Sequence, residues 1–287
     1  MTFKKKLWLS ITSLVLLTGL VACSSKSSDT KTVTSSTASE EKITVVAATG
    51  GGPKPFIYQD GNKLTGHNIE LVEAIFDKLP QYDLKIEKVE FSSMFSGLTS
   101  GRFQIAVNNL AKNAEREANY LFTDPIFKNS YVVIYQKDNE KAAEADSWTD
   151  LAGLSTVGSA GVNSTTAIEE YNKNNPDAQI TFNYTAEDLK SQLEGVESGK
   201  YDFLVMDKPM FEYYQKEYDL DLVGETISGE LETELLPAPY SYLVLAQDQK
   251  ELVEDINEAL KEVVEDGTSK EINLKYFGED YSPSYSK

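Results

Sequence analysis

The sequence predicts an α/β protein built of two similar units. Along most of the chain, β-prone runs alternate with amphipathic helical runs, as they do around parallel sheets. The alternation pauses after an apolar run at residues 131–135 and then starts again. The chain has 287 residues, of which 40% are hydrophobic and 25% charged. That length and composition allow about two globular domains.

The first unit begins with the β-prone run Ile-Thr-Val-Val-Ala-Ala at 43–48. A turn is expected at Asp60-Gly61, and then a helix with Asn68 as its N-cap. Apolar side chains at helical spacing define one face of that helix: Ile69, Val72, Ile75, Phe76 and Leu79. A strand at 84–91, a short helix near 94–100 and a strand at 105–108 complete the unit.

In the second unit, strands are predicted at 156–159, 180–184 and 203–206, and helices at 164–174, 187–198 and 208–216. A further strand follows near 240–246. The long helix after it presents Leu252, Ile256, Leu260, Val263 and Val264 on one face and stops at Gly267. The last helix lies near 269–277.

The N-terminus has the pattern of a secretory signal. Lysines 4–6 precede an apolar stretch that ends near Ala22, and that stretch is too short for a comfortable membrane span. It closes on Leu-Val-Ala-Cys at 20–23, which resembles a bacterial lipobox and contains the only cysteine. We expect residues 1–22 to be a lipoprotein signal peptide and Cys23 to be lipidated. The polar residues 23–42 would form a flexible tether to the outer face of the cell membrane.

Composition excludes several classes of function. The net charge of −19 argues against nucleic acid as a partner, because such a field repels phosphate. One histidine and one cysteine provide no zinc cage and no disulfide within the chain. The motifs HExxH, GxSxG and GxxxxGK[ST] are absent from the sequence. We therefore expect no metal site, no cofactor and no catalytic residue.

Two features have more than one interpretation. The glycines at 50–52 follow a strand, so they form either an anion-binding loop of backbone N–H groups or a plain turn. His67 is either a structural or surface residue or a general base, and its place before a helix with many core positions favours the former.

Several segments together resemble a known family. They are GRFQIAVNNL at 101–110, ERE at 115–117, YLFTDP at 120–125, KPF at 54–56, GHNIEL at 66–71, SGKYDF at 198–203 with Asp207, and DGT at 266–268. In order and spacing, residues 43–278 resemble the family 3 solute-binding proteins of ATP-binding-cassette (ABC) amino-acid importers.

The resemblance implies a type II periplasmic-binding-protein-like fold. Two α/β lobes, joined by two crossover strands, would hold an amino acid in the cleft between them. The first lobe would comprise 43–134 and 240–280, the second lobe 135–239, and residues 281–287 a tail.

The resemblance also implies the ligand-binding residues. Arg116 matches the arginine that binds the ligand carboxylate, and a guanidinium fork suits that task. Asp207 matches the acid that pairs with the ligand ammonium. Asn163 and Ser164, with Thr165, match a stretch that completes the carboxylate site. Three further positions fall in the binding region: Phe91, which matches an aromatic that packs on the ligand side chain, Asn109, and Ala111.

Departures from the family pattern bear on the ligand. Gly50 and Pro53 stand where many relatives have an acid and an aromatic, which argues against a cationic ligand side chain. Ala111 replaces a small hydroxyl residue, and Asn113 a threonine. The pattern Asn108-Asn109…Asn113-x-x-Arg116 resembles the branch that handles cystine and related amino acids.

The predicted function is capture of a neutral polar or sulfur-containing L-amino acid, such as cystine or glutamine, and its delivery to an ABC permease. The protein would act as a monomer, anchored to the membrane by lipid only. The alternatives are an extracytoplasmic enzyme on the same fold and a sensor or adhesin.

Overall fold

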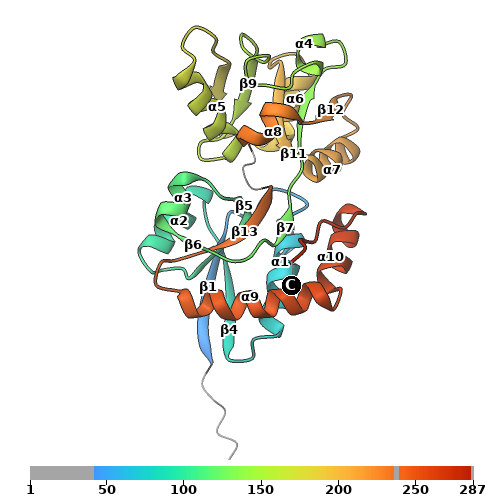
Figure 1. Cartoon of the computed structure of the whole chain (residues 1–287). Helices are drawn as coiled ribbons and strands as arrows, with labels where there is room; N and C mark the ends of the chain where they lie inside the picture. The colour runs from blue at the N-terminus through green and yellow to red at the C-terminus, as the bar shows by residue number, and fades with distance from the viewer. Residues whose placement is uncertain (1–41, 236–238, 286–287) are drawn as a thin grey trace, which may run out of the picture. The chain divides into compact units, whose positions relative to one another are not determined.

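In the computed structural model, residues 42–235 and 239–285 are described. They form two mixed sheets with helices on both faces of each, and a separate β-hairpin (Figure 1). The predicted signal peptide, Cys23 and all of the predicted tether except Lys42 lie outside the described residues. Within the described ranges, no helix is both long and apolar enough to cross a bilayer.

The first sheet has the strand order β4-β1-β5-β13-β6, and β7 also pairs with β13. Strands β1, β4 and β5 are parallel, and β13 is antiparallel to its neighbours. Its strands are β1 (Ile43–Thr49), β4 (Tyr82–Lys88), β5 (Ile105–Ala111), β6 (Leu121–Phe122), β7 (Phe127–Lys128) and β13 (Tyr240–Leu245). The hairpin consists of β2 (Tyr58–Asp60) and β3 (Lys63–Thr65), and its turn lies at the predicted place.

Alternate residues of these strands supply two apolar layers, because successive side chains point to opposite faces. One layer packs Ala47, Ile105 and Leu245 with α1 (His67–Asp77), α9 (Lys250–Glu265) and α10 (Thr268–Phe277). The other packs Ala48, Ala106 and Val244 with α2 (Phe91–Thr99). The short helix α3 (Ala114–Asn119) follows β5 directly.

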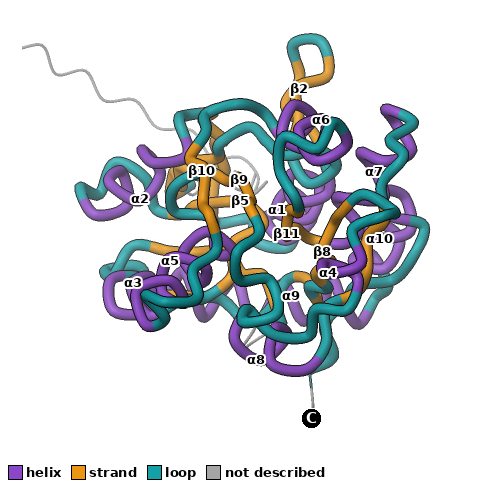
Figure 2. Tube along the Cα trace, turned by 90° about the horizontal axis from the view of Figure 1, so that it is seen from above, coloured by secondary structure: helices purple, strands orange, loops and turns teal. Residues whose placement is uncertain are grey.

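The second sheet has the strand order β10-β9-β11-β8-β12, and its orange strands β8 to β11 can be followed in Figure 2. Strands β9, β10 and β11 are parallel, whereas β8 runs antiparallel to β11 and β12. The strands are β8 (Tyr131–Tyr135), β9 (Ser155–Gly158), β10 (Thr181–Tyr184), β11 (Phe203–Asp207) and β12 (Val223–Thr226).

Helices again cover both faces of this sheet. One layer joins Val133 and Phe203 to α5 (Asn163–Asn174) and α8 (Gly229–Leu235). The other joins Ile134 and Leu204 to α6 (Leu189–Glu197) and α7 (Lys208–Tyr218). The short helix α4 (Glu140–Ala143) contacts β8.

Several predicted element boundaries differ from the structure, and the strand predicted at 105–108 continues to Ala111 as β5. Three further differences have a clear physical reason or bear on the site. The strand expected to end at 91 ends at Lys88, because its partner β1 ends at Thr49, and Phe91 instead opens α2. The N-cap of α1 is Gly66, not Asn68. Gly66 has φ 119°, and a Cβ there would lie 2.4 Å from the Phe56 carbonyl oxygen, so the site requires glycine. Helix α5 begins at Asn163 after the N-cap Val162, so Asn163 is inside the helix rather than before it.

Two segments connect the sheets and lie against each other. The Asn129 N–H, between β7 and β8, donates to the carbonyl oxygen of Pro239, the residue before β13, at 2.8 Å. The predicted lobe limit at 134/135 falls inside β8, which pairs with β11, so the second sheet begins at Tyr131. Beside β7, the Tyr281 carbonyl oxygen accepts a hydrogen bond from Lys128 N–H, and the Tyr281 ring stacks on Phe127.

Candidate functional site

Arg116 is placed by the sharp turn between β5 and α3. The Asn113 side chain caps α3 by accepting a hydrogen bond from the Arg116 N–H at 2.8 Å. The side chain of Arg116 is buried, although arginine is rarely buried unless it is paired. Burial lowers the pKa of Arg116 below its ordinary value, and nearby Tyr131 and Glu115 oppose that shift. The group remains a cation at neutral pH.

The guanidinium of Arg116 donates to neutral oxygens from both units. Nη1 donates to the Ala111 carbonyl oxygen at 2.8 Å and to Asn163 Oδ1 at 3.2 Å, and Nη2 donates to the Gly161 carbonyl oxygen at 2.9 Å. Among residues 42–235 and 239–285, no carboxylate lies within ion-pair distance of Arg116. This buried cation therefore has no counter-charge in the described part of the chain.

Asp207 is the second buried ionisable residue of this region, at the C-terminal end of the central strand β11. It is the N-cap residue of α7, but its side chain makes no capping hydrogen bond. Oδ2 accepts a long hydrogen bond of 3.4 Å from Asn109 Nδ2, and Oδ1 is buried with no partner among the described atoms. Burial raises the pKa of Asp207 well above its usual range, and the Asn109 amide opposes that shift. Only one of its two carboxylate oxygens is therefore hydrogen-bonded among the described residues.

Tyr131 lies near both Arg116 and Asp207, and the sequence analysis missed it. Its pKa is raised, first by burial and then by Asp207, while Arg116 lowers it. In the antiparallel register, Tyr131 of β8 pairs directly with Asp207 of β11. Only this pairing between strands places Tyr131 at the site, and no local motif marks it.

Of the residues predicted to bind the ligand carboxylate together with Arg116, some contact its guanidinium and others do not. Asn163 Oδ1 accepts from Arg116 and, at 3.4 Å, from Asn113 Nδ2, so both asparagines lie at the guanidinium. Ala111 contributes only its carbonyl oxygen. Ser164 and Thr165 are buried in the first turn of α5, and within the described residues neither is hydrogen-bonded to Arg116.

Phe91 lies near loops of both units. A Cβ added to Gly50 would lie 3.6 Å from Phe91, and a Cβ added to Gly161 would lie 3.9 Å from it. Its ring packs edge-on against Phe95, whose ring lies 5.0 Å from the Arg116 guanidinium. The structure therefore brings Phe91, Arg116, Asn109, Asn163 and Asp207 toward one region.

The glycine loop after β1 is held by its own neighbours. Asn108 Oδ1 accepts from the Gly50 N–H at 3.0 Å, and Thr49 Oγ1 accepts from the Gly51 N–H at 3.3 Å. Asn108 Nδ2 also donates to the Gly52 carbonyl oxygen. Because two of the three glycine amides are already hydrogen-bonded, the structure favours a turn over an anion-binding loop.

His67 is a core residue. It is completely buried among aromatic rings, 5.0 Å from Phe277 and 5.3 Å from Phe127 between ring centroids. Burial lowers the pKa of His67 to about 4, so the ring is neutral at physiological pH. The structural interpretation of the sequence is therefore favoured over a general base.

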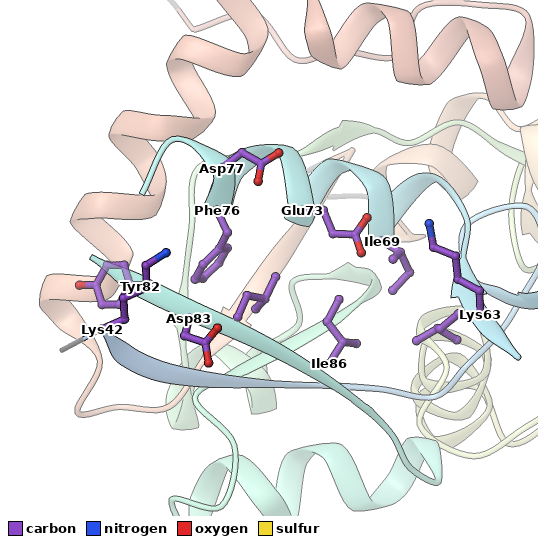
Figure 3. A pocket seen from close by; sticks show the side chains of 11 residues that line it. Lys42, Lys63, Ile69, Glu73, Phe76, Asp77, Tyr82, Asp83 and Ile86 are labelled. Atoms are coloured by element: carbon purple, nitrogen blue, oxygen red, sulfur yellow. The ribbon is translucent and has the colours of Figure 1, made fainter. Parts of the chain in front are cut away.

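A surface hollow of about 570 Å³ lies elsewhere, between α1, β4 and the β2-β3 hairpin (Figure 3). Ile69, Phe76 and Ile86 provide apolar walls, and Glu73 and Asp83 project near its rim. None of the predicted site residues lines it, and its acids are not buried and unpaired as Asp207 is. Among the residues described, no group of three or more His, Cys, Asp or Glu side chains is arranged to hold a metal.

Comparison with known proteins adds independent information. A family model of bacterial extracellular solute-binding proteins, family 3, matches residues 45–279. L-cystine-binding protein TcyA of Bacillus subtilis (strain 168) is 30% identical over 252 residues, which are 85% of this chain and 84% of TcyA. L-cystine-binding protein TcyJ of the same organism is 27% identical over 245 residues, 84% of this chain and 86% of TcyJ.

A solved structure is also similar to this chain. It comes from work on glutathione import in Gram-positive bacteria via GshT and the cystine ABC importer TcyBC of Streptococcus mutans. That chain is 36% identical to this one with a TM-score of 0.77, and the match covers 85% of this chain and 98% of that chain.

Proposed function

This chain belongs to the bacterial extracellular solute-binding proteins of family 3, and from that premise we propose that it captures a sulfur-containing amino acid between its two lobes. Relatives in this family are the amino-acid-binding components of ABC importers, and the two-lobed α/β fold is shared with them. The first lobe contains the first sheet, and the second lobe the second sheet. The ligand would pass from this protein to a membrane permease.

The observation that carries the proposal is a pair of buried, opposite charges with no protein counter-ion among the described residues. Arg116 donates only to neutral oxygens, and Asp207 has one carboxylate oxygen without a partner. Burying an uncompensated charge is costly, so such charges require a partner from elsewhere. A free amino acid supplies both partners, since its carboxylate suits Arg116 and its ammonium suits Asp207.

Binding would exchange hydrogen bonds rather than only add them. A carboxylate bound at Arg116 takes the places now held by the Gly161 carbonyl oxygen and Asn163 Oδ1, both from the second lobe. Charge-assisted bidentate bonds are stronger than bonds to neutral oxygens, so this exchange is favourable. Asn113 and Asn163 remain close enough to reorient around the ligand.

The neighbourhood of Gly50 supports a ligand side chain without positive charge. Gly50 packs toward Phe91, and its N–H is held by Asn108, so this wall of the site offers no acid. Cystine fits this chemistry, and the relatives TcyA and TcyJ are named as cystine-binding proteins.

Glutathione is a second candidate because of the structural match to the chain from the glutathione-import work. Its γ-glutamyl end has a free ammonium and a free α-carboxylate, the same pair of groups that Arg116 and Asp207 would bind. A neutral polar amino acid such as glutamine presents that pair as well.

Ligand identity is tested by thermal shift measurements with the twenty amino acids, cystine and both redox forms of glutathione, followed by calorimetry. We expect cystine or glutathione to raise the melting temperature most. Selective stabilisation by arginine or lysine would contradict the proposed ligand class. Turnover of any of these compounds would favour the enzyme alternative.

The membrane attachment rests on the sequence alone. We propose that Cys23 is acylated and that the protein works as a monomer at the outer face of the membrane, held by lipid only. A lipoprotein with two or more acyl chains is stably anchored, whereas one chain is marginal. The Cys23→Ala protein should therefore leave the detergent phase and appear outside the membrane fraction, and retention in the membrane would contradict the lipid anchor.

A further inference from the structure

A chain of polar side chains leads from Asp207 into both connecting segments. Asn109 Nδ2 donates to Asp207 Oδ2, and Ser241 Oγ lies within hydrogen-bond distance of Asn109 Oδ1. Ser241 Oγ is also 3.0 Å from Asn129 Oδ1. Asn129, Ser241 and Asp207 are buried, so water competes little with these contacts.

The four residues come from four different parts of the chain. Asp207 ends β11 in the second lobe, and Asn109 lies in β5 of the first lobe. Ser241 follows the start of β13, and Asn129 lies between β7 and β8, where its N–H is bonded to Pro239. The chain thus joins the proposed ammonium site to the two segments that connect the lobes.

The hydrogens available fix the direction of these bonds. A serine hydroxyl has one hydrogen, so Ser241 cannot donate to Asn109 Oδ1 and to Asn129 Oδ1 at once. At the same time, Asn129 Nδ2 is buried without a partner among the described atoms. Turning the Asn129 amide by 180° resolves both problems, because Nδ2 then donates to Ser241 Oγ and the hydroxyl donates to Asn109 Oδ1.

We propose that Ser241 and Asn129 are positioning residues that hold the Asn109 amide on Asp207 Oδ2, so that Asp207 Oδ1 is left for the ligand ammonium. The ligand part of this inference rests on the proposed function, whereas the control of the Asp207 carboxyl does not. With its oxygen held by Ser241, Asn109 must present its N–H donors to Asp207.

The expected consequence of losing these contacts is a change in the pKa of the Asp207 carboxyl. The Asn109 donor stabilises the Asp207 anion against burial, so its loss raises the pKa of that carboxyl further. Two tyrosines lie near Asp207, namely Tyr131 of β8 and Tyr281 of the tail, and Arg116 lies near Tyr131. The adjacent Lys208 pairs with Glu212 on α7. Burial raises the pKa of both tyrosines, so they stay neutral across the acid range, and Arg116 stays charged.

The first test needs no ligand. The titration of the Asp207 carboxyl is followed by carbon-detected NMR in the ligand-free wild type and in Ser241→Ala. We expect the variant to raise the pKa of Asp207 by as much as about one, the equivalent of one hydrogen bond. Asn129→Ala should raise it less, because Ser241 can still donate to Asn109, and it serves as the second variant if Ser241→Ala does not fold.

The matched control is Ser269→Ala. Ser269 is also a completely buried serine with one side-chain hydrogen bond, to Ser282, but it lies in α10. It should leave the titration of Asp207 unchanged. An unchanged pKa of Asp207 in both Ser241→Ala and Asn129→Ala would overturn the inference, whatever the protein binds.

The second test uses the best ligand from the thermal shift screen. Ser241→Ala should weaken binding about threefold to tenfold at neutral pH, and its loss of affinity on acidification should begin at a higher pH than in the wild type. If the wild type binds no amino acid while Ser241→Ala still raises the pKa of Asp207, the proposed function fails and the positioning role stands. If ligand binds but its affinity and pH profile are the same in both proteins, the positioning role fails.

Discussion

His67 and Asp207 are both buried titratable residues, yet their surroundings differ. His67 lies among aromatic rings of the first lobe, and its Nδ1 is hydrogen-bonded to the neighbouring Asn68. Asp207 lies among polar groups of both lobes, with the buried cation Arg116 in the same region. Burial shifts both residues toward their neutral forms, lowering the pKa of His67 and raising that of Asp207.

A binding group and a core group can both be buried and titratable. An atom without a partner is not sufficient, since His67 Nε2 also has none among the described residues. The distinguishing feature is the opposite charge of Arg116, which is itself buried without a counter-ion in the described chain. A neutral His67 needs nothing from outside the protein, whereas the proposed ligand would supply a carboxylate to Arg116 and an ammonium to Asp207.

The largest expected effect is on binding, from removing either charge. Arg116→Ala or Asp207→Asn leaves one end of a bound amino acid buried and unpaired, at about 3–5 kcal/mol. Affinity measured by calorimetry should therefore fall roughly 10²-fold to 10³-fold or more. The melting temperature of ligand-free Asp207→Asn should not fall, because the change removes a buried charge.

Controls for this prediction come from the surface. Arg102, the other arginine of the chain, has a side chain 63% exposed and pairs with Glu87, so Arg102→Ala should bind like the wild type. Affinity within about threefold of wild type in Arg116→Ala or Asp207→Asn would place the ligand elsewhere.

The next effect is on stability and concerns His67. Its pKa is about 4 in the folded protein, where it is buried, and 6.5 in the unfolded chain, where it is not. Between those values the unfolded chain binds a proton that the native protein does not, so stability is full above pH 6.5 and falls as the pH drops toward 4. The full difference is about 3 kcal/mol.

Urea unfolding at several pH values between 7.5 and 4 measures this slope. Carboxylates add their own acid sensitivity, so the informative quantity is the difference between wild type and His67→Gln, which lacks the imidazole. That difference should shrink by about 3 kcal/mol on acidification. A difference independent of pH would mean that the pKa of His67 is the same in the folded and the unfolded protein.

The smallest expected effect tests the wall at Gly50. A side chain fits there, since an added Cβ makes an ordinary contact of 3.6 Å with Phe91. Gly50→Asp should improve the affinity for arginine or lysine about tenfold, as a charge-assisted hydrogen bond does. Gly50→Asn is the control of equal size, and an equal gain in both variants would show that the added charge is irrelevant.

Much of the fold could be predicted, because apolar periodicity reports burial directly. The stripe Ile69, Val72, Ile75 and Phe76 is the buried face of α1, and the runs at β8 and β11 are buried strands. The polar helix α3 has no apolar stripe and escaped prediction. The end of β4 also could not be predicted, because it depends on where its partner β1 stops.

The same distinction between local patterns and contacts with distant segments applies to the candidate site. Arg116 and Asp207 belong to short segments with a family resemblance, so the sequence pointed to them. Tyr131, Ser241 and Asn129 reach the site through strand pairing and through contacts between distant parts of the chain, such as Ser241 with Asn109. A pattern along the sequence does not contain that information.

The placement of β13 has a consequence for synthesis. All strands of the second sheet lie within 131–226, so they are complete before β13 at 240–245 joins the first sheet between β5 and β6. A nascent chain emerges from its N-terminus, and until β13 arrives one edge of β5 has no neighbour in the sheet. Exposed strand edges template aggregation, so chaperone protection matters most for the first lobe. A chain that ends before β13 therefore leaves an unpaired strand edge in the first sheet, whereas the strands of the second sheet are all present.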